Sequence, residues 1–476
     1  MSSDKLHVSI VVAGHVDAGK SSLTGRLLYD MGGIDERTME KLKKKAEENG
    51  KPSFAFAYHM DNQKAEQERG ITIACNTKEF YTDRYHYTII DAPGHRDFIK
   101  NMITGSSQAD VALLLCPADG GSFVASIAKG DHKTGEVPGQ TRNHARLLNL
   151  LGIKQLIVGI NKMDSEVDGE SYGEKRYVEI MTEVKRILLQ EGWKKDQIEK
   201  EIPIVPMAGF LGENILSKSD KMPWWKGVDI KIATTGGECH VDCLLDALDK
   251  MVNLPPRNVD GAFRAPVGKV ITSIKGIECV VTSRIEQGTL AKGEEVVFLP
   301  THTASNTCMG KVFTIEMHHK EHPNAGPGDN VGISMKGLSK ANMPRDGDIM
   351  VKKSDSSFKS CETFVVQAMV LEHPGQIKCG YSPNCYVRTS HAACRLVEIK
   401  FKMGKKSTGG QKVDAPDYIE KGDMAELIFK PTRPFVVDDF KSCEGLSRIA
   451  MLEGTVVCMI GKCTKVNFVE EVGKKK

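Results

Sequence analysis

Three short motifs in a fixed order constrain the fold of this chain more than any other feature. They are Gly14-His-Val-Asp-Ala-Gly19-Lys20-Ser21, Asp91-Ala-Pro-Gly94-His95 and Asn161-Lys162-Met-Asp164. Each motif follows or ends an apolar run that predicts a buried strand, and residues 21–28 predict a helix. A strand that leads through a glycine-rich loop into a helix is the context that a phosphate-binding loop requires. We therefore expect an α/β nucleotide-binding domain.

The first motif predicts a phosphate site because it matches G-x-x-x-x-G-K-[S/T] in full. Its glycines let backbone N–H groups converge on phosphates at a helix N-terminus, where the helix dipole favours negative charge. Lys20 is expected to reach the β- and γ-phosphates, and the Ser21 hydroxyl to hold Mg²⁺. The residues predicted to surround the nucleotide here are Gly14, His15, Val16, Asp17, Ala18, Gly19, Lys20, Ser21 and Ser22.

The second motif predicts a switch that detects the γ-phosphate. Asp91 ends an apolar strand and can hold a Mg²⁺-bound water, and Gly94 has no side chain to keep its N–H from the phosphate. Alone, D-x-x-G is a common turn, and a single histidine is usually a surface or packed residue. Because His95 directly follows the switch glycine, we expect it to orient the attacking water as the catalytic residue.

The third motif predicts which base is bound. The Asp164 carboxylate can accept hydrogen bonds from guanine N1–H and the exocyclic amine, whereas adenine offers neither donor in that geometry. Asn161 and Lys162 complete the motif, which is weak alone but strong as the third member of the ordered set. The three motifs together predict a GTPase, with GTP and GDP as its nucleotides.

The chain is predicted to form three domains, at residues 1–250, 251–352 and 353–476. Apolar strands in the first alternate with helical patterns, which indicates a parallel sheet with helices on both faces. Its expected strands are 6–13, 85–91, 110–117, 155–161 and 202–207. After a boundary at Leu254-Pro-Pro-Arg-Asn, short β-rich runs separated by Gly, Pro and Asp turns predict two antiparallel β-barrels.

Composition excludes some classes of protein and leaves others open. The formal net charge of +3 permits an RNA partner without arguing for one. No run of about 18 apolar residues is present, and the first residues do not resemble a signal peptide. We therefore expect a cytoplasmic chain without a membrane partner, whose thirteen cysteines are reduced thiols. Cys239-His-Val-Asp-Cys243 hints at a metal, but packing ahead of a helix is favoured because no second Cys/His pair follows.

On these motifs the chain resembles the elongation factor 1-alpha family of translational GTPases over nearly its whole length. Further matching segments are Glu66-Gln-Glu-Arg-Gly70-Ile71-Thr72-Ile, Asp97-Phe-Ile-Lys-Asn-Met-Ile-Thr-Gly, Met222-Pro-Trp-Trp-Lys-Gly and His373-Pro-Gly-Gln-Ile. The resemblance implies GTP-dependent delivery of aminoacyl-tRNA to the ribosomal A site during elongation. It also implies hydrolysis stimulated by the ribosome, a guanine-nucleotide exchange factor as partner, and a monomeric chain.

The resemblance also assigns roles to matching residues. Thr72 would close onto Mg²⁺ and the γ-phosphate in the GTP state, and Asp17 would lie where a monovalent cation can bind. Val16 and Ile71 would form an apolar gate that keeps His95 from the attacking water until the ribosome acts. The metal residues are thus Ser21, Thr72 and, through water, Asp91.

Several segments depart from the family pattern. The guanine O6 loop reads Met207-Ala208-Gly209 where Ser-Gly is usual, and a backbone N–H at Ala208 and Gly209 should suffice there. An insertion covers residues 134–139, and the first barrel reads Gly276-Ile-Glu278-Cys279. In the last barrel, Met451-Leu-Glu-Gly-Thr455 replaces a stretch that usually carries two arginines, which weakens the expected phosphate contacts. These departures resemble the divergent elongation factor-like branch, either with tRNA binding intact or with a changed cargo or exchange partner.

Two other functions stay open from sequence. One is a release or ribosome-rescue GTPase that carries a protein mimicking tRNA, although such relatives usually have long N-terminal extensions. The other is actin or scaffold binding as a secondary role. The charged helix at residues 36–48 is most simply a solvated face, with ribosome or tRNA contact as the sharper alternative.

Overall fold

The computed structural model describes residues 5–469 except 62, 70, 74, 107–108, 129–138, 255–256, 273–277, 318–319, 340, 372 and 374. Parts of the sequence interpretation lie outside the described residues: Gly70, most of the insertion, the prolines at the expected boundary, Gly276, Pro374 and the lysine tail. The chain divides into two compact units, residues 1–255 and 256–476. We propose the finer boundaries after residues 250 and 352, the second of which coincides with the end of a strand at Lys352.

The first unit is built on a sheet with the order β2-β3-β1-β4-β5-β6. The strands are β1 (Leu6–Gly14), β2 (Asn76–Tyr81), β3 (Tyr85–Asp91), β4 (Val111–Pro117), β5 (Gln155–Asn161) and β6 (Ile204–Pro206). From β3 to β6 the pairing is parallel, as predicted, and β3, β4, β5 and β6 are buried throughout. The edge strand β2 runs antiparallel to β3, which the sequence interpretation did not anticipate.

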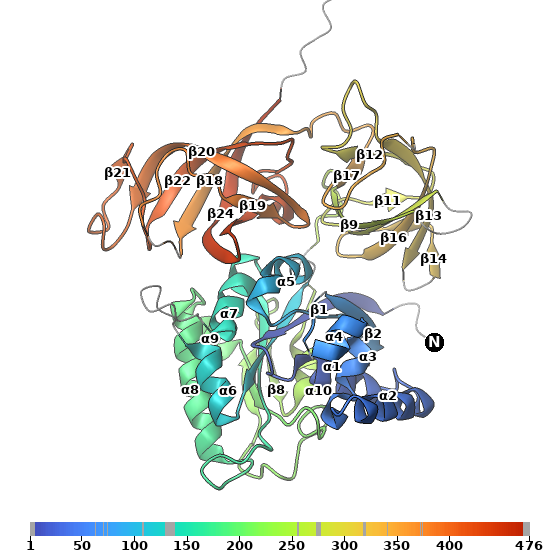
Figure 1. The fold of residues 1–476 in the computed structure, drawn as a ribbon, viewed down its shortest axis with the longest axis vertical. Coiled ribbons are helices and arrows are strands. Elements are labelled where there is room, and N and C mark those ends of the chain that lie inside the picture. The colour runs from blue at the N-terminus through green and yellow to red at the C-terminus, as the bar shows by residue number, and fades with distance from the viewer. Residues whose placement is uncertain are drawn as a thin grey trace, which may run out of the picture. The chain divides into compact units, whose positions relative to one another are not determined.

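Helices cover both faces of this sheet, as predicted (Figure 1). The main ones are α1 (Lys20–Asp30), α2 (Glu36–Glu48), α5 (Ile99–Ser106), α6 (Gly120–Ile127), α7 (Gln140–Leu150), α8 (Glu174–Gln190) and α9 (Lys195–Lys200). Short elements lie between α2 and β2, namely η1 (Pro52–Phe54), α3 (Ala57–Met60) and α4 (Lys64–Arg69). After β6 follow β7 (Val228–Lys231), β8 (Glu238–Val241), α10 (Leu244–Asp246) and a π-turn, η3 (Ala247–Met251).

The second unit contains two closed antiparallel barrels, as predicted. The first barrel has the ring order β12-β17-β9-β10-β16-β13, closed by the pairing of β12 with β13. Its strands are β9 (Ala265–Ile271), β10 (Cys279–Arg284), β12 (Glu295–Leu299), β13 (Met309–Met317), β16 (Asn330–Lys336) and β17 (Ile349–Lys352). The short strands β11 (Leu290–Ala291), β14 (Lys320–His322) and β15 (Asn324–Ala325) decorate it.

The second barrel has the ring order β19-β23-β24-β18-β22-β20, closed by the pairing of β19 with β20. Its strands are β18 (Cys361–Val370), β19 (Asn384–Val387), β20 (Ser390–Met403), β22 (Met424–Pro431), β23 (Arg448–Glu453) and β24 (Val456–Phe468). A short strand β21 (Val413–Asp414) and a helical turn α11 (Glu444–Ser447) complete it.

Buried charges join the two barrels into one unit. Arg264 donates to the Asp355 carboxylate at 2.6 Å and lies 4.2 Å from the centre of the Phe358 ring. Arg388 of the second barrel donates to Glu286 of the first at 2.8 Å. Such pairs cost desolvation unless their geometry is good, so they fix one mutual arrangement of the barrels more than they add stability.

Candidate functional site

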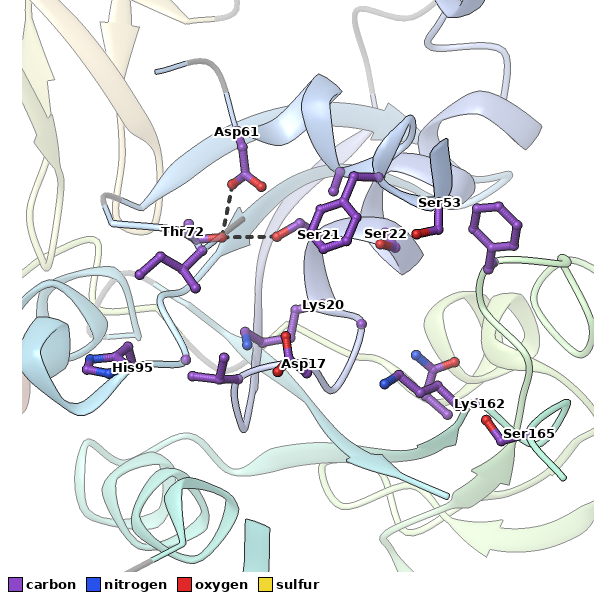
Figure 2. A pocket seen from close by; sticks show the side chains of 18 of the residues that line it. Asp17, Lys20, Ser21, Ser22, Ser53, Asp61, Thr72, His95, Lys162 and Ser165 are labelled. Atoms are coloured by element: carbon purple, nitrogen blue, oxygen red, sulfur yellow. Dashed lines mark hydrogen bonds between the residues drawn. The ribbon is translucent and has the colours of Figure 1, made fainter. Parts of the chain in front are cut away.

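A cavity of the first unit lies where β1, β3 and β5 end, as expected for a ligand site on a parallel sheet. It has a volume of about 480 Å³. Segments from all three motifs line it, together with parts of the chain between α2 and β2 (Figure 2). The lining residues are Val16, Asp17, Gly19, Lys20, Ser21, Ser22, Ser53, Phe54, Ala57, Asp61, Ile71, Thr72, Gly94, His95, Asn161, Lys162, Asp164, Ser165 and Phe210.

The loop between β1 and α1, which the sequence predicts to bind phosphates, forms one end of the cavity, and we call this the phosphate end after that prediction. Lys20 is 6% exposed, and its ammonium donates a hydrogen bond to the carbonyl of His15 at 2.8 Å. Burial lowers the pKa of Lys20, against the opposing effect of the Asp91 charge. A lysine whose charge is compensated so poorly by protein partners is suited to an anionic ligand such as a phosphate.

A buried histidine supports the first turn of this loop. The backbone N–H of Gly14 donates to Nδ1 of His144, a residue of α7, at 2.9 Å. Burial lowers the pKa of His144 to about 3, so the ring is neutral near pH 7 and its Nδ1 can act as an acceptor. His144 was not among the residues that the sequence identified.

Gly94 lies very close to the phosphate loop. A Cβ atom at this position would be 2.4 Å from the Lys20 nitrogen and 2.9 Å from the backbone nitrogen of Val16. Any larger residue would therefore push the second motif away from the first. The second motif and the phosphate loop are therefore in direct contact at Gly94.

A chain of hydroxyl and carboxyl groups continues from the phosphate loop. Ser21 Oγ donates to Asp91 Oδ2 at 2.5 Å and lies 3.0 Å from Thr72 Oγ1, which donates to Asp61 Oδ1 at 2.9 Å. Figure 2 shows Thr72 and Ser21 side by side above Lys20, with Asp61 above Thr72. Three residues expected at a metal thus lie together, and Asp61 joins them as a residue that the sequence interpretation missed.

The two carboxylates of this chain carry raised pKa values. Burial raises the pKa of Asp91 to about 6, and burial followed by the nearby Asp91 charge raises that of Asp61 to about 7. Asp91 Oδ1 is buried without a hydrogen-bond partner in the described part of the chain. Carboxylate and hydroxyl oxygens are the kinds of group that Mg²⁺ prefers in proteins.

His95 occupies the opposite end of the cavity from Lys162 and Ser165 (Figure 2). Its side chain is 39% exposed, and its Nδ1 accepts a hydrogen bond from the Asp97 N–H at 3.3 Å. The same nitrogen lies 3.4 Å from the Asp97 carboxylate. Val16 and Ile71, the residues of the gate that the resemblance implies, line the same cavity.

The end of the cavity lined by the third motif, which we call the base end after its predicted role, is held together by Asn161. Its amide nitrogen donates to the Ala18 carbonyl at 2.9 Å, and its Oδ1 accepts the N–H of Gly209 at 2.8 Å. The third motif, the phosphate loop and the loop after β6 are thereby connected through one side chain. Lys162 pairs with Asp119 at 3.0 Å, and the half-buried Asp164 lines the cavity.

Some of the predicted nucleotide residues do not line the cavity but support it. They are Gly14, His15, Ala18, Asp91, Ala208 and Gly209. The Ala208 N–H donates to the Glu213 carbonyl at 3.2 Å, so both N–H groups expected to meet guanine O6 have protein acceptors here. The cavity wall at this point is instead the ring of Phe210, which no motif indicated.

The cysteine cluster at residues 239–243, which begins within β8, does not form a metal site. Within the described ranges, no group of three or more His, Cys, Asp or Glu side chains could hold a metal ion. Cys243 is buried directly before α10, and His240 pairs with Asp229 at 2.7 Å. In the same described part of the chain, no helix has the length and apolar character that crossing a membrane requires.

Comparisons with known proteins agree with this architecture. Residues 5–254 match the elongation factor Tu GTP binding domain, residues 279–351 match elongation factor Tu domain 2, and residues 363–464 match the GTP-eEF1A C-terminal domain-like family. Elongation factor 1-alpha of Entamoeba histolytica is 42% identical over 97% of this chain and 96% of its own length. The protein of the same name from Methanosarcina barkeri is 41% identical, over 98% and 99%.

Among solved structures, the Ski7 GTPase-like domain of S. cerevisiae bound to GTP has the same fold. Its TM-score is 0.74 at 18% identity, over 97% of each chain. The GTPase domain and two barrels define a translational GTPase, an enzyme that binds GTP and GDP and hydrolyses GTP. The chain belongs to the elongation factor 1-alpha family, which delivers aminoacyl-tRNA to the ribosome during elongation.

Proposed function

We propose that the cavity at the ends of β1, β3 and β5 is the GTP site, with roles for individual residues that follow from its geometry. The observation that supports this best is that all three motifs line one cavity. In this assignment the 14–22 loop and Lys20 hold the phosphates, and Gly94 reports the γ-phosphate. Asp164 accepts from the guanine edge, while Asn161 joins the base loops to the phosphate loop.

Ser21, Thr72 and, through water, Asp91 are the residues proposed to hold Mg²⁺, and we add Asp61. Support comes from the chain of contacts among them and from the buried, unpartnered Asp91 Oδ1. A bound Mg²⁺ would neutralise charge on the phosphate oxygens as GTP is hydrolysed. Asp17, in a left-handed backbone conformation with φ of 62°, is the proposed neighbour of a monovalent cation.

His95 is proposed to orient the attacking water when the ribosome admits it to the γ-phosphate. Its partly exposed position at the edge of the cavity supports slow hydrolysis by the free protein. Slow intrinsic hydrolysis suits a carrier, because early hydrolysis would release the cargo. An activator in another GTPase contributes roughly 10⁵-fold, which gives the scale that ribosomal stimulation can reach.

We further propose delivery to the ribosomal A site, an exchange factor as partner, a monomeric state, a cytoplasmic location and actin binding as a secondary role. We also assign the chain to the divergent elongation factor-like branch of the family. Its identity with a eukaryotic relative, 42%, is about the same as with an archaeal one, 41%. A chain on the standard eukaryotic branch would be expected to resemble the eukaryotic protein more.

The test is protection of the aminoacyl ester of charged tRNA from spontaneous hydrolysis, with the protein in its GTP form and in its GDP form. Strong protection in the GTP form alone is the expected result, and it would show that the altered segment 451–455 leaves tRNA binding intact. Absence of protection in both forms, with GTP binding intact, would contradict a tRNA cargo. A protein cargo, as in release or rescue factors, would then be the better assignment.

A further inference from the structure

An aromatic contact joins the segment between η1 and α3 to the loop that follows β6. Phe56 lies between η1 and α3 and is 8% exposed. Its ring meets the ring of Phe210 edge to face, with centroids 5.8 Å apart and planes at 78°. Phe210 is 41% exposed and lines the cavity, so one ring of this pair is part of the wall of the nucleotide site.

The same segment supplies further parts of that wall. Ser53 and Phe54, which belong to η1, and Ala57, at the start of α3, all line the cavity. Figure 2 shows Ser53 on the same side of the cavity as Ser22, away from His95. Residues 53–57, which we call the cover, therefore form one side of the site. Phe56 is the residue through which the cover contacts the loop after β6, which contains Phe210 and which we call the base loop.

Arg26 of α1 holds both members of the pair. Its Nη1 donates to the Phe210 carbonyl at 2.9 Å, and its guanidinium lies 5.5 Å from the centre of the Phe56 ring. Nε of Arg26 donates to both carboxylate oxygens of Asp30 at 2.8 Å, which fixes the guanidinium plane. Because α1 begins at Lys20, the helix that carries the phosphate lysine also ties the cover to the base loop.

The position of Phe56 is determined from further sides. A Cβ on Gly25 of α1 would lie 2.1 Å from the Phe56 carbonyl oxygen, so the two backbones are in direct contact. The ring of Tyr29 packs on Phe56 with centroids 5.9 Å apart. Gly25, Arg26 and Tyr29 all belong to α1, so this one helix holds the Phe56 ring where it meets Phe210 edge to face.

We propose that the contact between Phe56 and Phe210 retains the bound guanine nucleotide, and that these two are positioning residues which set its dissociation rate. This inference rests on the proposed GTP site. The nucleotide can leave past residues 53–57 only after the two rings separate. The contact therefore lowers the dissociation rate constant of the nucleotide. The association rate constant should change little, because nucleotide enters when the two rings are already apart.

The experiment measures release of a radiolabelled, non-hydrolysable GTP analogue into excess unlabelled nucleotide at constant Mg²⁺. The proteins are wild type, Phe56→Leu, Phe210→Leu and the double variant. From the strength of one aromatic pair, each single change should accelerate release about 3- to 10-fold, with little change in association. The double variant should be no faster than the faster single variant, since both changes remove the same contact.

Phe80→Leu is the matched control. Phe80 is 2% exposed and stacks on Tyr87 at 4.9 Å, outside the cavity, so this variant should lose thermal stability and keep the wild-type release rate. Unchanged release from Phe56→Leu, or effects that multiply in the double variant, would overturn the proposal. If Phe56→Leu fails to fold, the exposed Phe210→Leu still tests it, and unchanged release there overturns it. Failure of wild type to retain the analogue would overturn the GTP site itself.

Discussion

The two ends of the nucleotide cavity are built from different chemistry. At the phosphate end, the loop and its surroundings are held by ionisable groups that are buried, namely Lys20, Asp91, Asp61 and His144. At the base end, the loops are joined by the amide of Asn161 and by rings, and these contacts involve no buried charge. The phosphate end thus depends on buried ionisable groups whose pKa values burial shifts, whereas the base end depends on neutral contacts within the protein.

Lys20→Ala should produce the largest effect, because it removes the cation at the uncompensated end. The loss should be about 4 kcal/mol, or roughly 10³-fold in affinity for GTP, since the phosphates would lose a buried charge partner. Equilibrium binding of a fluorescent GTP analogue measures it. Lys195→Ala, at a lysine whose side chain is 77% exposed, is the control and should bind as wild type does. A loss of GTP affinity of less than tenfold in Lys20→Ala would show that binding at the phosphate end does not depend on a buried charge.

His95→Ala should separate binding from hydrolysis within the phosphate end. GTP affinity should stay close to wild type, because the His95 side chain is 39% exposed at the cavity edge. Ribosome-stimulated turnover should fall by roughly 10³-fold, as expected for loss of a group that positions or activates water. Single-turnover phosphate release with ribosomes measures the change. Unchanged stimulated turnover would remove His95 from the mechanism.

Asp164→Asn tests the base end. It should weaken the binding of GTP, and a nucleotide with a different base should recover binding to the variant. Two charge-assisted hydrogen bonds to guanine are lost, which should weaken GTP binding by roughly 10²-fold. Xanthine carries a carbonyl where guanine has its amine, so the introduced amide can donate to it and xanthosine triphosphate should bind the variant better than GTP. Competition between the two nucleotides measures the preference. A variant that still prefers GTP would place guanine recognition elsewhere.

The sequence could identify those site residues that belong to a motif of neighbouring residues. A phosphate loop or an Asn-Lys-x-Asp motif is read from a few neighbouring residues, and the buried strands before them are continuous apolar runs. His144 and Phe56 carry no such signal, since the contact of Gly14 with His144 spans 130 residues and that of Phe56 with Phe210 depends on how two loops fold.

The edge strand β2 was missed for a related reason. Its burial alternates only weakly along Asn76–Tyr81, because an edge strand is buried on fewer sides than the central strands. The barrels could be predicted as a class from their turns and short β-runs. Their closure and the charged pairs between them, such as Arg388 with Glu286, depend on residues about a hundred positions apart.

The smallest effect should come from His144→Asn, which replaces an ionisable support of the phosphate loop by an amide like that of Asn161. The new side chain can accept the Gly14 N–H through its Oδ1 without titrating. In wild type, burial holds the pKa of His144 at about 3, below the value near 6.5 of an unfolded histidine. As pH falls below about 6.5, the unfolded chain takes up a proton that the folded chain does not, so stability is lost with decreasing pH.

The free energy of unfolding of nucleotide-free wild type, measured in urea from pH 7.5 to pH 5, should therefore contain a contribution that His144→Asn lacks. At pH 5 wild type should have lost about 1 to 2 kcal/mol more than the variant, each relative to its own value at pH 7.5. His59, whose pKa burial lowers to about 4, titrates in both proteins and cancels from the difference. If the free energies of unfolding of wild type and variant changed in parallel with pH, His144 would be protonated in the folded state. The two ends of the cavity would then not differ in their response to acid.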